Sequence, residues 1–265
     1  MLRAADYLER IGFPEAHPTP DVETLRRLHR AHLLSVPFEN LDIAWGRAIP
    51  IDEDRFLQKI IDERRGGFCY ELNGAFAALL RALGYRVTLL SARVPRQDGS
   101  DGPEFDHLTL RVDLDEPWLA DVGFGDSFLE PLRLNSRDPQ MQGADAYRVM
   151  DLPGALRVVS SRSAGAWKTE YDFTLQPRSL QDFADMCRYH QTSPESPFTR
   201  KRICSLPLQD GRITLSDMRL IRTRKESRDE TALSSQADWR AALKQHFGIE
   251  QPDKDAGSVG RGVTS

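Results

Sequence analysis

The 265-residue chain has few cysteines, no excess of positive charge and no long apolar segment. Its three cysteines, Cys69, Cys187 and Cys204, are odd in number, and their spacing fits neither a disulfide framework nor a zinc ribbon. We therefore expect reduced thiols and no bound metal. A formal net charge of -4 provides no electrostatic attraction to nucleic acid, so a nucleic-acid partner is not expected.

The lack of a long apolar run argues against a location in a membrane. No segment approaches the roughly 20 apolar residues of a membrane-spanning helix. Residues 1–7 carry charges where a signal peptide would have its apolar core. With 40% hydrophobic and 29% charged residues, the composition is ordinary for a globular protein of one or two domains. We predict a cytoplasmic protein without a membrane partner.

The hydrophobic pattern changes after Gly84, from helical spacing to short alternating segments separated by Gly and Pro. Helices are predicted at residues 4–11, 21–33, 52–63, 69–84, 180–189 and 238–247. Strands are predicted at residues 86–94, 107–112, 118–122, 147–151, 156–160, 168–175 and 212–221. The β region is predicted to be antiparallel and to form a small barrel, and the tail after Gln251 is predicted to be disordered.

Cys69 is the candidate nucleophile. It follows Gly66 and Gly67 and precedes an apolar helical pattern, which predicts a position at a helix N-terminus. The peptide dipoles there carry about half a positive charge, which favours a thiolate and lowers the pKa of a thiol. Glycines permit positive φ angles and a close approach of backbone to ligand, and free N–H groups at a helix start can hold an oxyanion. Cys187 and Cys204 lack these features and are predicted to be structural.

His107 and Asp121 are the candidates for a base and for the group that orients it. His107 lies on a predicted strand after a flexible turn, and Asp121 lies near the end of the next strand. The interval between them accommodates a strand, a turn and a return strand, which would bring the two side chains together. The carboxylate would then fix the imidazole tautomer, and the other ring nitrogen would activate the thiol. The remaining histidines have no obvious partner: His17, His29, His32, His190 and His246.

Two further segments have the composition of ligand contacts. Gly123-Phe124-Gly125 is either an ordinary turn or a segment whose N–H groups face a phosphate or an acyl donor. The basic run of residues 200–202 is either a solvated loop or a contact for the phosphates of a coenzyme.

Taken together, these segments resemble the arylamine N-acetyltransferase family. The similarity covers nearly the whole chain and lies in residues 7–12, 36–41 (VPFENL), 65–73 (RGGFCYELN), 92–94, 107, 121–125 and 192–198. It implies an α+β multidomain fold with a cysteine-protease-like catalytic core. The implied parts are a helical N-terminal domain (1–85) with the nucleophile, a β-barrel middle domain (86–190) with the His and Asp, an α/β C-terminal lid (191–250) and the tail (251–265).

The resemblance implies ping-pong acetyl transfer through a catalytic triad of Cys69, His107 and Asp121. Cys69 would take the acetyl group from acetyl-CoA, its co-substrate. An arylamine, arylhydroxylamine or hydrazine would then take it from the enzyme, as in xenobiotic metabolism. By motif, Glu39 and Arg65 are similar to a structural ion pair that orders the loop before the nucleophile.

The resemblance also implies ligand contacts. Phe38 and Phe124 match positions of the acceptor pocket, where an aromatic floor would suit a planar amine, although core packing is an alternative role for Phe38. Gly123 and Gly125 are nominated as CoA contacts.

Two alternatives remain open. A cysteine hydrolase of papain or transglutaminase type uses the same triad order, with water or a lysine amine as the acceptor. The other is a family member that has a specialised acyl donor or forms an internal amide in a biosynthetic pathway. The motifs do not distinguish among short acyl donors or acceptor amines, and they indicate no oligomeric state.

Overall fold

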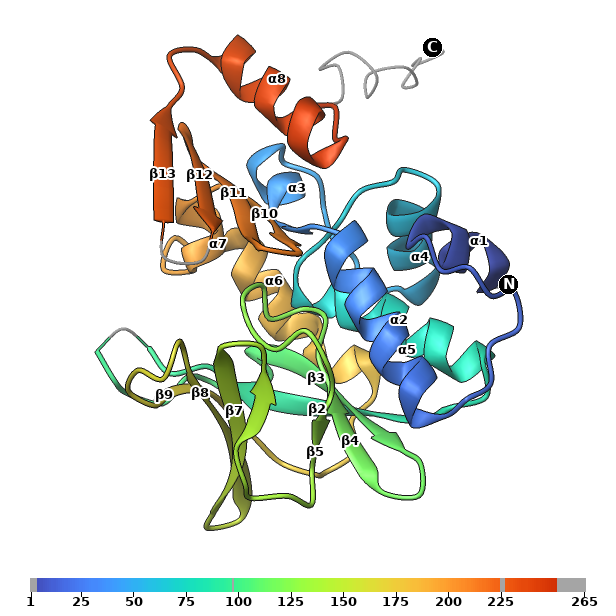
Figure 1. The fold of residues 1–265 in the computed structure, drawn as a ribbon. Helices are drawn as coiled ribbons and strands as arrows, with labels where there is room; N and C mark the ends of the chain where they lie inside the picture. Colours follow the sequence, from blue (N-terminus) through green and yellow to red (C-terminus); the bar gives the residue numbers. More distant parts are fainter. Residues whose placement is uncertain (1–3, 97, 225–226, 252–265) are drawn as a thin grey trace, which may run out of the picture.

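The computed structural model describes residues 4–96, 98–224 and 227–251, which form an α+β structure of helices and two antiparallel sheets (Figure 1). The helices of the N-terminal part are α1 (Ala4–Arg10), α2 (Val22–Ser35), α3 (Leu41–Ala44), α4 (Glu53–Ile61) and α5 (Cys69–Ala82). Helices α1, α2, α4 and α5 gather on one side of the molecule in Figure 1, with α5 close to the strands that follow it, whereas α3 lies near the second sheet.

Local capping chemistry starts two of these helices. Oδ1 of Asp21 accepts the N–H of Thr24, and Oδ1 of Asp52 accepts the N–H of Arg55. Each bond satisfies a donor that the first turn of a helix leaves without an intrahelical acceptor. Helix α5 differs, because nearly all of its side chains are buried. It lies in the apolar cluster that α1, α2 and α4 share with the first strands, so burial from all sides stabilises it.

An eight-stranded antiparallel sheet follows α5 and has a barrel-like form (Figure 1). Its strands are β2 (Arg86–Arg93), β3 (His107–Asp113), β4 (Pro117–Ala120), β5 (Leu132–Arg133), β6 (Gln140–Gln142), β7 (Asp145–Leu152), β8 (Ala155–Ser161) and β9 (Lys168–Phe173). The spatial order is β5-β4-β3-β2-β9-β8-β7-β6. The carboxamide of Gln140 bonds both the N–H and the carbonyl oxygen of Arg133, so a side chain joins the two edge strands. This contact covers edges that would otherwise be open.

A second sheet has the order β1-β10-β11-β12-β13. Its strands are β1 (Phe38–Glu39), β10 (Ile203–Leu208), β11 (Gly211–Ser216), β12 (Arg219–Arg224) and β13 (Ser227–Ala232). The connection from the first sheet contains the 3₁₀ turn η1 (Leu180–Phe183), α6 (Ala184–Thr192) and α7 (Pro197–Arg200), and α8 (Gln236–Phe247) follows β13. Apolar residues of α8, Trp239 and Leu243 among them, share a cluster with Ile213 and Leu215 of β11. Because β1 belongs to the N-terminal part, this sheet joins the two ends of the described chain.

The predicted single strand over residues 212–221 is wrong. This segment forms two strands, β11 and β12, with a turn between them at Asp217, where φ is 47°. Aspartate is among the residues that tolerate this left-handed region. The predicted helix over residues 180–189 begins as the turn η1 and continues to Thr192. Strand β13 was not predicted. All of its side chains are exposed, so it has no alternating apolar pattern, and only its pairing with β12 shows that it is a strand.

The predicted domain boundaries at residues 85 and 190 stay a prediction. The apolar cluster of the helical part extends across the first of them, since it includes Leu108 and Leu110 of β3. The predicted disordered tail lies outside the described residues, except for Gln251. Within the described part of the chain, no helix has the length and apolar character needed to cross a membrane.

Candidate active site

Cys69 is the first residue of α5, where its sequence context predicted a helix N-terminus. The N–H of Phe68 donates to Oε2 of Glu71 (3.1 Å), so a side chain of the first turn caps the helix. Cys69 is buried, with 4% of its surface exposed, yet it lines a cavity. The first-turn N–H groups, which have no acceptor within the helix, belong to the same turn as Cys69.

Gly66 and Gly67 serve close packing rather than an unusual backbone conformation. Neither has a φ angle in the left-handed region. A Cβ at Gly66 would lie 1.8 Å from the carbonyl oxygen of Pro37, and one at Gly67 would lie 2.7 Å from Oε2 of Glu71. Of the two properties that glycine permits here, the structure uses close packing of the backbone and not a positive φ angle. The missing side chains instead allow the loop before Cys69 to lie against Pro37 and α5.

His107 begins β3, Asp121 follows β4, and the two form a buried pair. Nε2 of His107 lies 2.6 Å from Oδ2 of Asp121. A carboxylate only accepts hydrogen bonds, so Nε2 carries the proton and Nδ1 remains for another partner. Oδ1 of Asp121 accepts from Nδ2 of Asn73 (2.9 Å) and from the N–H of Gly123 (3.0 Å). Burial alone would raise the pKa of Asp121, but His107 and these two donors outweigh it and hold the pKa below its ordinary value.

Asn73 was not predicted as a site residue. Its Nδ2 also donates to the carbonyl oxygen of Leu108 (2.6 Å), and its Oδ1 accepts the N–H of Val122 (2.9 Å). One amide thus ties α5 to β3 and to the segment after β4. The signal in the sequence is its position four residues after Cys69, which places both on one face of the helix.

Position at a helix N-terminus does not by itself ionise the thiol of Cys69. Burial raises the pKa of this thiol well above its ordinary value, and the N–H of Leu108 acts in the opposite direction. The carboxylate of Asp106, which lines the same cavity, raises the pKa further. The expected lowering of the thiol pKa is therefore wrong for the resting site. Ionisation requires a base, and His107 lines the same cavity.

Cys69 and His107 line a cavity of about 660 Å³ with aromatic walls. The walls include Phe38, Phe124 and Phe198. The ring of Phe124 meets the ring of His107 edge-on, with centroids 5.2 Å apart, and the ring of Phe38 lies 6.2 Å from that of Phe198. Both phenylalanines singled out by sequence therefore face the cavity, which suits a flat aromatic ligand.

Gly123 and Gly125 have different structural reasons to be glycine. Gly123 lines the cavity, and a Cβ there would lie 2.7 Å from Nδ2 of Asn73 and 2.9 Å from Cα of Cys69. Gly125 has a φ angle of 93°, a conformation that favours glycine. The first glycine allows the β4–β5 connection to contact α5, and the second turns the chain. Their contact with CoA stays a prediction.

The basic run of residues 200–202 divides between two places. Arg200 and Lys201 line the cavity and are exposed. Arg96, far from them in the sequence, also lines the cavity and is exposed. Arg202 instead lies over the ring of Trp239, 4.6 Å from its centroid. Three basic side chains therefore line the cavity, together with the carboxylates of Asp106 and Glu195.

Comparison with known proteins identifies the family of this chain. Residues 21–256 match a family described as N-acetyltransferase. The arylamine N-acetyltransferase of Mycolicibacterium smegmatis is 34% identical over 256 residues, which cover 93% of this chain and 92% of the relative. The chain belongs to the arylamine N-acetyltransferase family.

Solved structures of other arylamine N-acetyltransferases have the same fold. The enzyme of Salmonella typhimurium superposes with a TM-score of 0.88 at 32% identity, over 97% of this chain and 95% of the other. The Mycobacterium marinum enzyme in complex with CoA superposes with a TM-score of 0.85 at 30% identity, over 92% of each chain. This member of the family is accordingly an acetyl-transferring enzyme.

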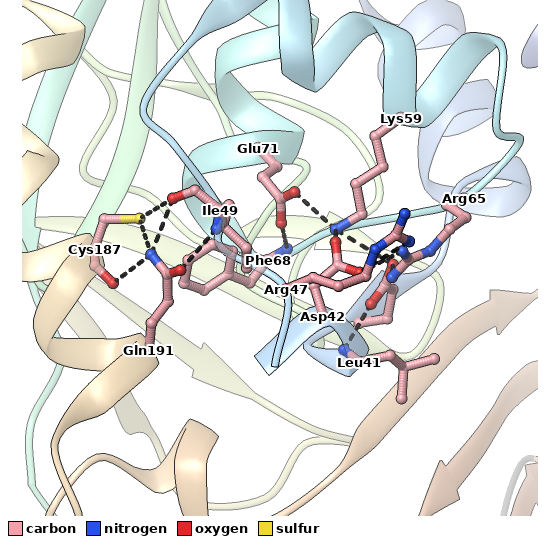
Figure 2. Close-up of polar contacts among 11 residues, drawn as sticks. Leu41, Asp42, Arg47, Ile49, Lys59, Arg65, Phe68, Glu71, Cys187 and Gln191 are labelled. Atoms are coloured by element: carbon pink, nitrogen blue, oxygen red, sulfur yellow. Dashed lines mark hydrogen bonds and ion pairs between the residues drawn. The ribbon is translucent and has the colours of Figure 1, made fainter. Parts of the chain in front are cut away.

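Beside the helix that carries Cys69, this acetyltransferase has a buried cluster of charged side chains, shown in part in Figure 2. Its members are Glu39, Asp42, Lys59, Arg65 and Glu71. Nη2 of Arg65 lies 2.7 Å from Oε1 of Glu39, the pair that the family resemblance implied. Nζ of Lys59 lies 2.8 Å from Oδ2 of Asp42 and 2.7 Å from Oε1 of Glu71. Opposite charges in contact offset the cost of burying them.

Lys59 was not predicted as part of this cluster. It lies on the buried face of α4 together with Phe56 and Ile60. This position is the signal that would have found it, because a cation in an apolar stripe needs a buried partner.

The other cysteines of this acetyltransferase are free and buried. Sγ of Cys187 contacts the carbonyl oxygen of Ile49 at 3.7 Å and Nε2 of Gln191 at 3.2 Å (Figure 2). Burial raises the pKa of Cys187 to about 12 and also raises the pKa of Cys204. Neither thiol is among the residues that line the cavity of Cys69.

Proposed function

We propose that this chain transfers an acetyl group from acetyl-CoA to an arylamine, arylhydroxylamine or hydrazine through a thioester on Cys69. The observation that carries the proposal is the 2.6 Å contact between His107 and Asp121 at the cavity that Cys69 lines. Cysteine proteases use the same set of groups, so we propose a protease-like catalytic core. The names of the relatives and the CoA complex of the Mycobacterium marinum enzyme support the choice of substrates.

In the first half-reaction, Nδ1 of His107 accepts the thiol proton while the sulfur of Cys69 attacks the acetyl carbonyl carbon. N–H groups at the start of α5 hold the oxyanion that forms. The bond from carbon to the CoA sulfur then breaks, and that sulfur takes the proton from His107. Asp121 orients the imidazolium and stabilises its charge. One thioester replaces another, so the step is reversible.

In the second half-reaction, the acceptor nitrogen attacks the thioester, and His107 moves a proton from that nitrogen to the departing sulfur of Cys69. An aniline nitrogen is a weak base that is unprotonated at neutral pH, so its lone pair is available. The amide product is more stable than the thioester, which drives the transfer. The rings of Phe38 and Phe124 supply apolar surface for a flat acceptor.

The positive charges at the cavity suit the phosphates of CoA. Arg96, Arg200 and Lys201 are exposed there, and their donors would pair with phosphate oxygens. Gly123 provides a wall without a side chain between this region and Cys69.

The test is the release of CoA in the absence of an acceptor. Mixed with acetyl-CoA alone, the enzyme should release about one CoA per site and then nearly stop, as an acyl-enzyme accumulates. Intact-protein mass spectrometry should show one added acetyl group, and a substituted aniline should restart CoA release. Cys69→Ala should abolish both signals. Cys187→Ala is the matched control, because it removes a buried thiol that does not line the cavity, and it should retain both.

The same experiment tests the hydrolase alternative. A cysteine hydrolase would cleave a peptide, and it would release CoA either not at all or steadily without an amine. Steady CoA release that no amine changes, or full activity in Cys69→Ala, would overturn the proposed transfer.

A further inference from the structure

His29 is a fully buried side chain of α2 that takes no direct part in the proposed acetyl transfer. Its Nδ1 lies 2.9 Å from the carbonyl oxygen of Leu129, and its Nε2 lies 3.0 Å from the backbone nitrogen of Asp121. These two backbone groups belong to the connection between β4 and β5. One imidazole therefore links α2 to two points of the segment that carries the triad carboxylate. Sequence analysis found no partner for this histidine.

The two partners determine the protonation state of His29. A carbonyl oxygen only accepts and a backbone N–H only donates, so Nδ1 must carry the proton and Nε2 must be the acceptor. Burial lowers the pKa of His29 to about 4, against the opposing effects of the contacts with Leu129 and Asp121, so the ring is neutral at neutral pH. In a protonated ring, Nε2–H would face the N–H of Asp121, and the contact would be lost.

Packing fixes the orientation of the same ring. It stacks on Phe128, with centroids 5.8 Å apart and an interplanar angle of 13°. It meets Phe76 of α5 edge-on, with centroids 6.0 Å apart. The ring cannot turn away from Asp121 without breaking these contacts.

We propose that His29 is a positioning residue, which accepts the N–H of Asp121 and thereby places Oδ2 of that residue against Nε2 of His107. The inference rests on the proposed role of the triad. Asn73 and Gly123 orient the carboxylate through Oδ1, whereas His29 holds the backbone to which the carboxylate is attached. The 2.6 Å contact between Oδ2 of Asp121 and Nε2 of His107 requires that both the carboxylate and its backbone are held in place.

His32 is a matched control on the same helix. It is also fully buried, one turn further along α2, and its ring also packs against Phe76, with centroids 5.3 Å apart. Its Nδ1, however, lies 3.0 Å from the hydroxyl oxygen of Tyr7 and has no contact with the triad. A variant at His32 therefore shows what the loss of a buried imidazole does by itself.

Two amide substitutions separate the two contacts of His29. An asparagine amide reaches the position of Nδ1, so His29→Asn keeps a donor for Leu129 and loses the acceptor for Asp121. A glutamine amide reaches the position of Nε2, so His29→Gln keeps an acceptor for Asp121. Both replace a buried ring by a smaller amide and lose the stacking, so both should lower the melting temperature, as should His32→Asn.

Two readouts on the folded variants report the position of the carboxylate. The first is the downfield ¹H NMR signal of the proton between His107 and Asp121, which requires no substrate. The second is the rate at which iodoacetamide alkylates Cys69, measured at each cysteine by mass spectrometry. In His29→Asn we expect the NMR signal to move or disappear and alkylation to slow by roughly tenfold to a hundredfold, the effect of misplacing a catalytic group by about 1 Å. His29→Gln and His32→Asn should keep the signal and stay close to the wild-type rate.

A wild-type NMR signal in His29→Asn would overturn the inference, and so would the same loss in His32→Asn. Two further outcomes would overturn it: equal effects of His29→Asn and His29→Gln, and a His29→Gln protein that does not fold. Either would show that the site needs the packing of the ring and not its acceptor nitrogen. Failure of the proposed triad has a different signature: Cys69 in the wild type would be alkylated no faster than Cys187, while the NMR comparison would still decide the role of His29. Failure of acetyl transfer alone would appear as steady CoA release without an amine.

Discussion

Nζ of Lys59 lies 2.7 Å from Oε1 of Glu71, the third residue of the helix that begins with Cys69. In the buried cluster around this pair, the three carboxylates of Glu39, Asp42 and Glu71 face the two cations of Lys59 and Arg65. Burial raises the pKa of Glu71 to about 7, although Lys59 opposes the shift. The partly exposed Arg47 adds a third cation, 3.7 Å from Oδ1 of Asp42.

Glu71→Gln should change how stability depends on pH. The carboxyl group of Glu71 has a pKa of 4.5 when unperturbed and about 7 in the folded protein. Folding therefore takes up a proton between these values, and the wild-type free energy of unfolding should fall as pH rises through this window, by at most about 3 kcal/mol. Glutamine does not titrate, so the variant should gain stability relative to the wild type as pH rises. Denaturant unfolding on both sides of the window measures the difference.

Glu9→Gln is the control for this comparison, because Glu9 is an exposed glutamate of α1. Denaturant unfolding of this variant over the same pH range shows what the removal of an exposed carboxylate does. A constant difference between Glu71→Gln and the wild type would show that Glu71 titrates normally in the folded protein.

Glu39→Gln should act through stability. Glu39 has no exposed surface, and its carboxylate contacts the buried guanidinium of Arg65. Removing one partner of a buried pair costs roughly 3–5 kcal/mol, because the other charge stays buried. We expect a low soluble yield and a lower midpoint of denaturant unfolding. A stable protein without transfer activity would indicate a direct catalytic role for Glu39 instead.

Asp121→Asn should remove most activity while the protein stays folded. The amide can present an N–H to Nε2 of His107, which would move the ring proton to Nδ1 and leave no acceptor for the thiol. The comparable change in a serine triad lowers the rate by about 10⁴. Turnover and thermal melting should be measured on the same preparation. Wild-type turnover by the folded variant would remove Asp121 from the triad.

Gly123→Ala should slow the acetylation of Cys69. The new Cβ would lie 2.7 Å from Nδ2 of Asn73 and 2.9 Å from Cα of Cys69, so the helix start or the loop must move, at a cost of about 1–3 kcal/mol. The single-turnover rate at saturating acetyl-CoA should therefore fall. An unchanged saturating rate with a higher half-saturating acetyl-CoA concentration would mean that Gly123 chiefly contacts the donor.

Local sequence was enough to predict the features that depend on neighbouring residues. The helices predicted to begin at residues 21 and 52 have first turns that Asp21 and Asp52 cap, each through a bond to a residue three positions away. The β3–β4 hairpin brings His107 and Asp121 together over a short interval, so the spacing allowed their pairing, and the structure shows the contact at 2.6 Å. The prediction of one strand over residues 212–221 was wrong because the local sequence carries no turn signal: no Gly or Pro marks the turn at Asp217.

The sequence by itself determined the change from helices to strands after Gly84, the place of Cys69 at a helix start and the family of the chain. Only the tertiary structure decided the partners of His29, Lys59 and Asn73, and the high pKa of the Cys69 thiol. Helix caps and hairpins depend on residues a few positions apart, which a sequence pattern records. A contact such as that of His29 with Asp121, 92 residues away, and the burial of a thiol depend on how whole elements pack, because desolvation arises from all the atoms that exclude water from the site.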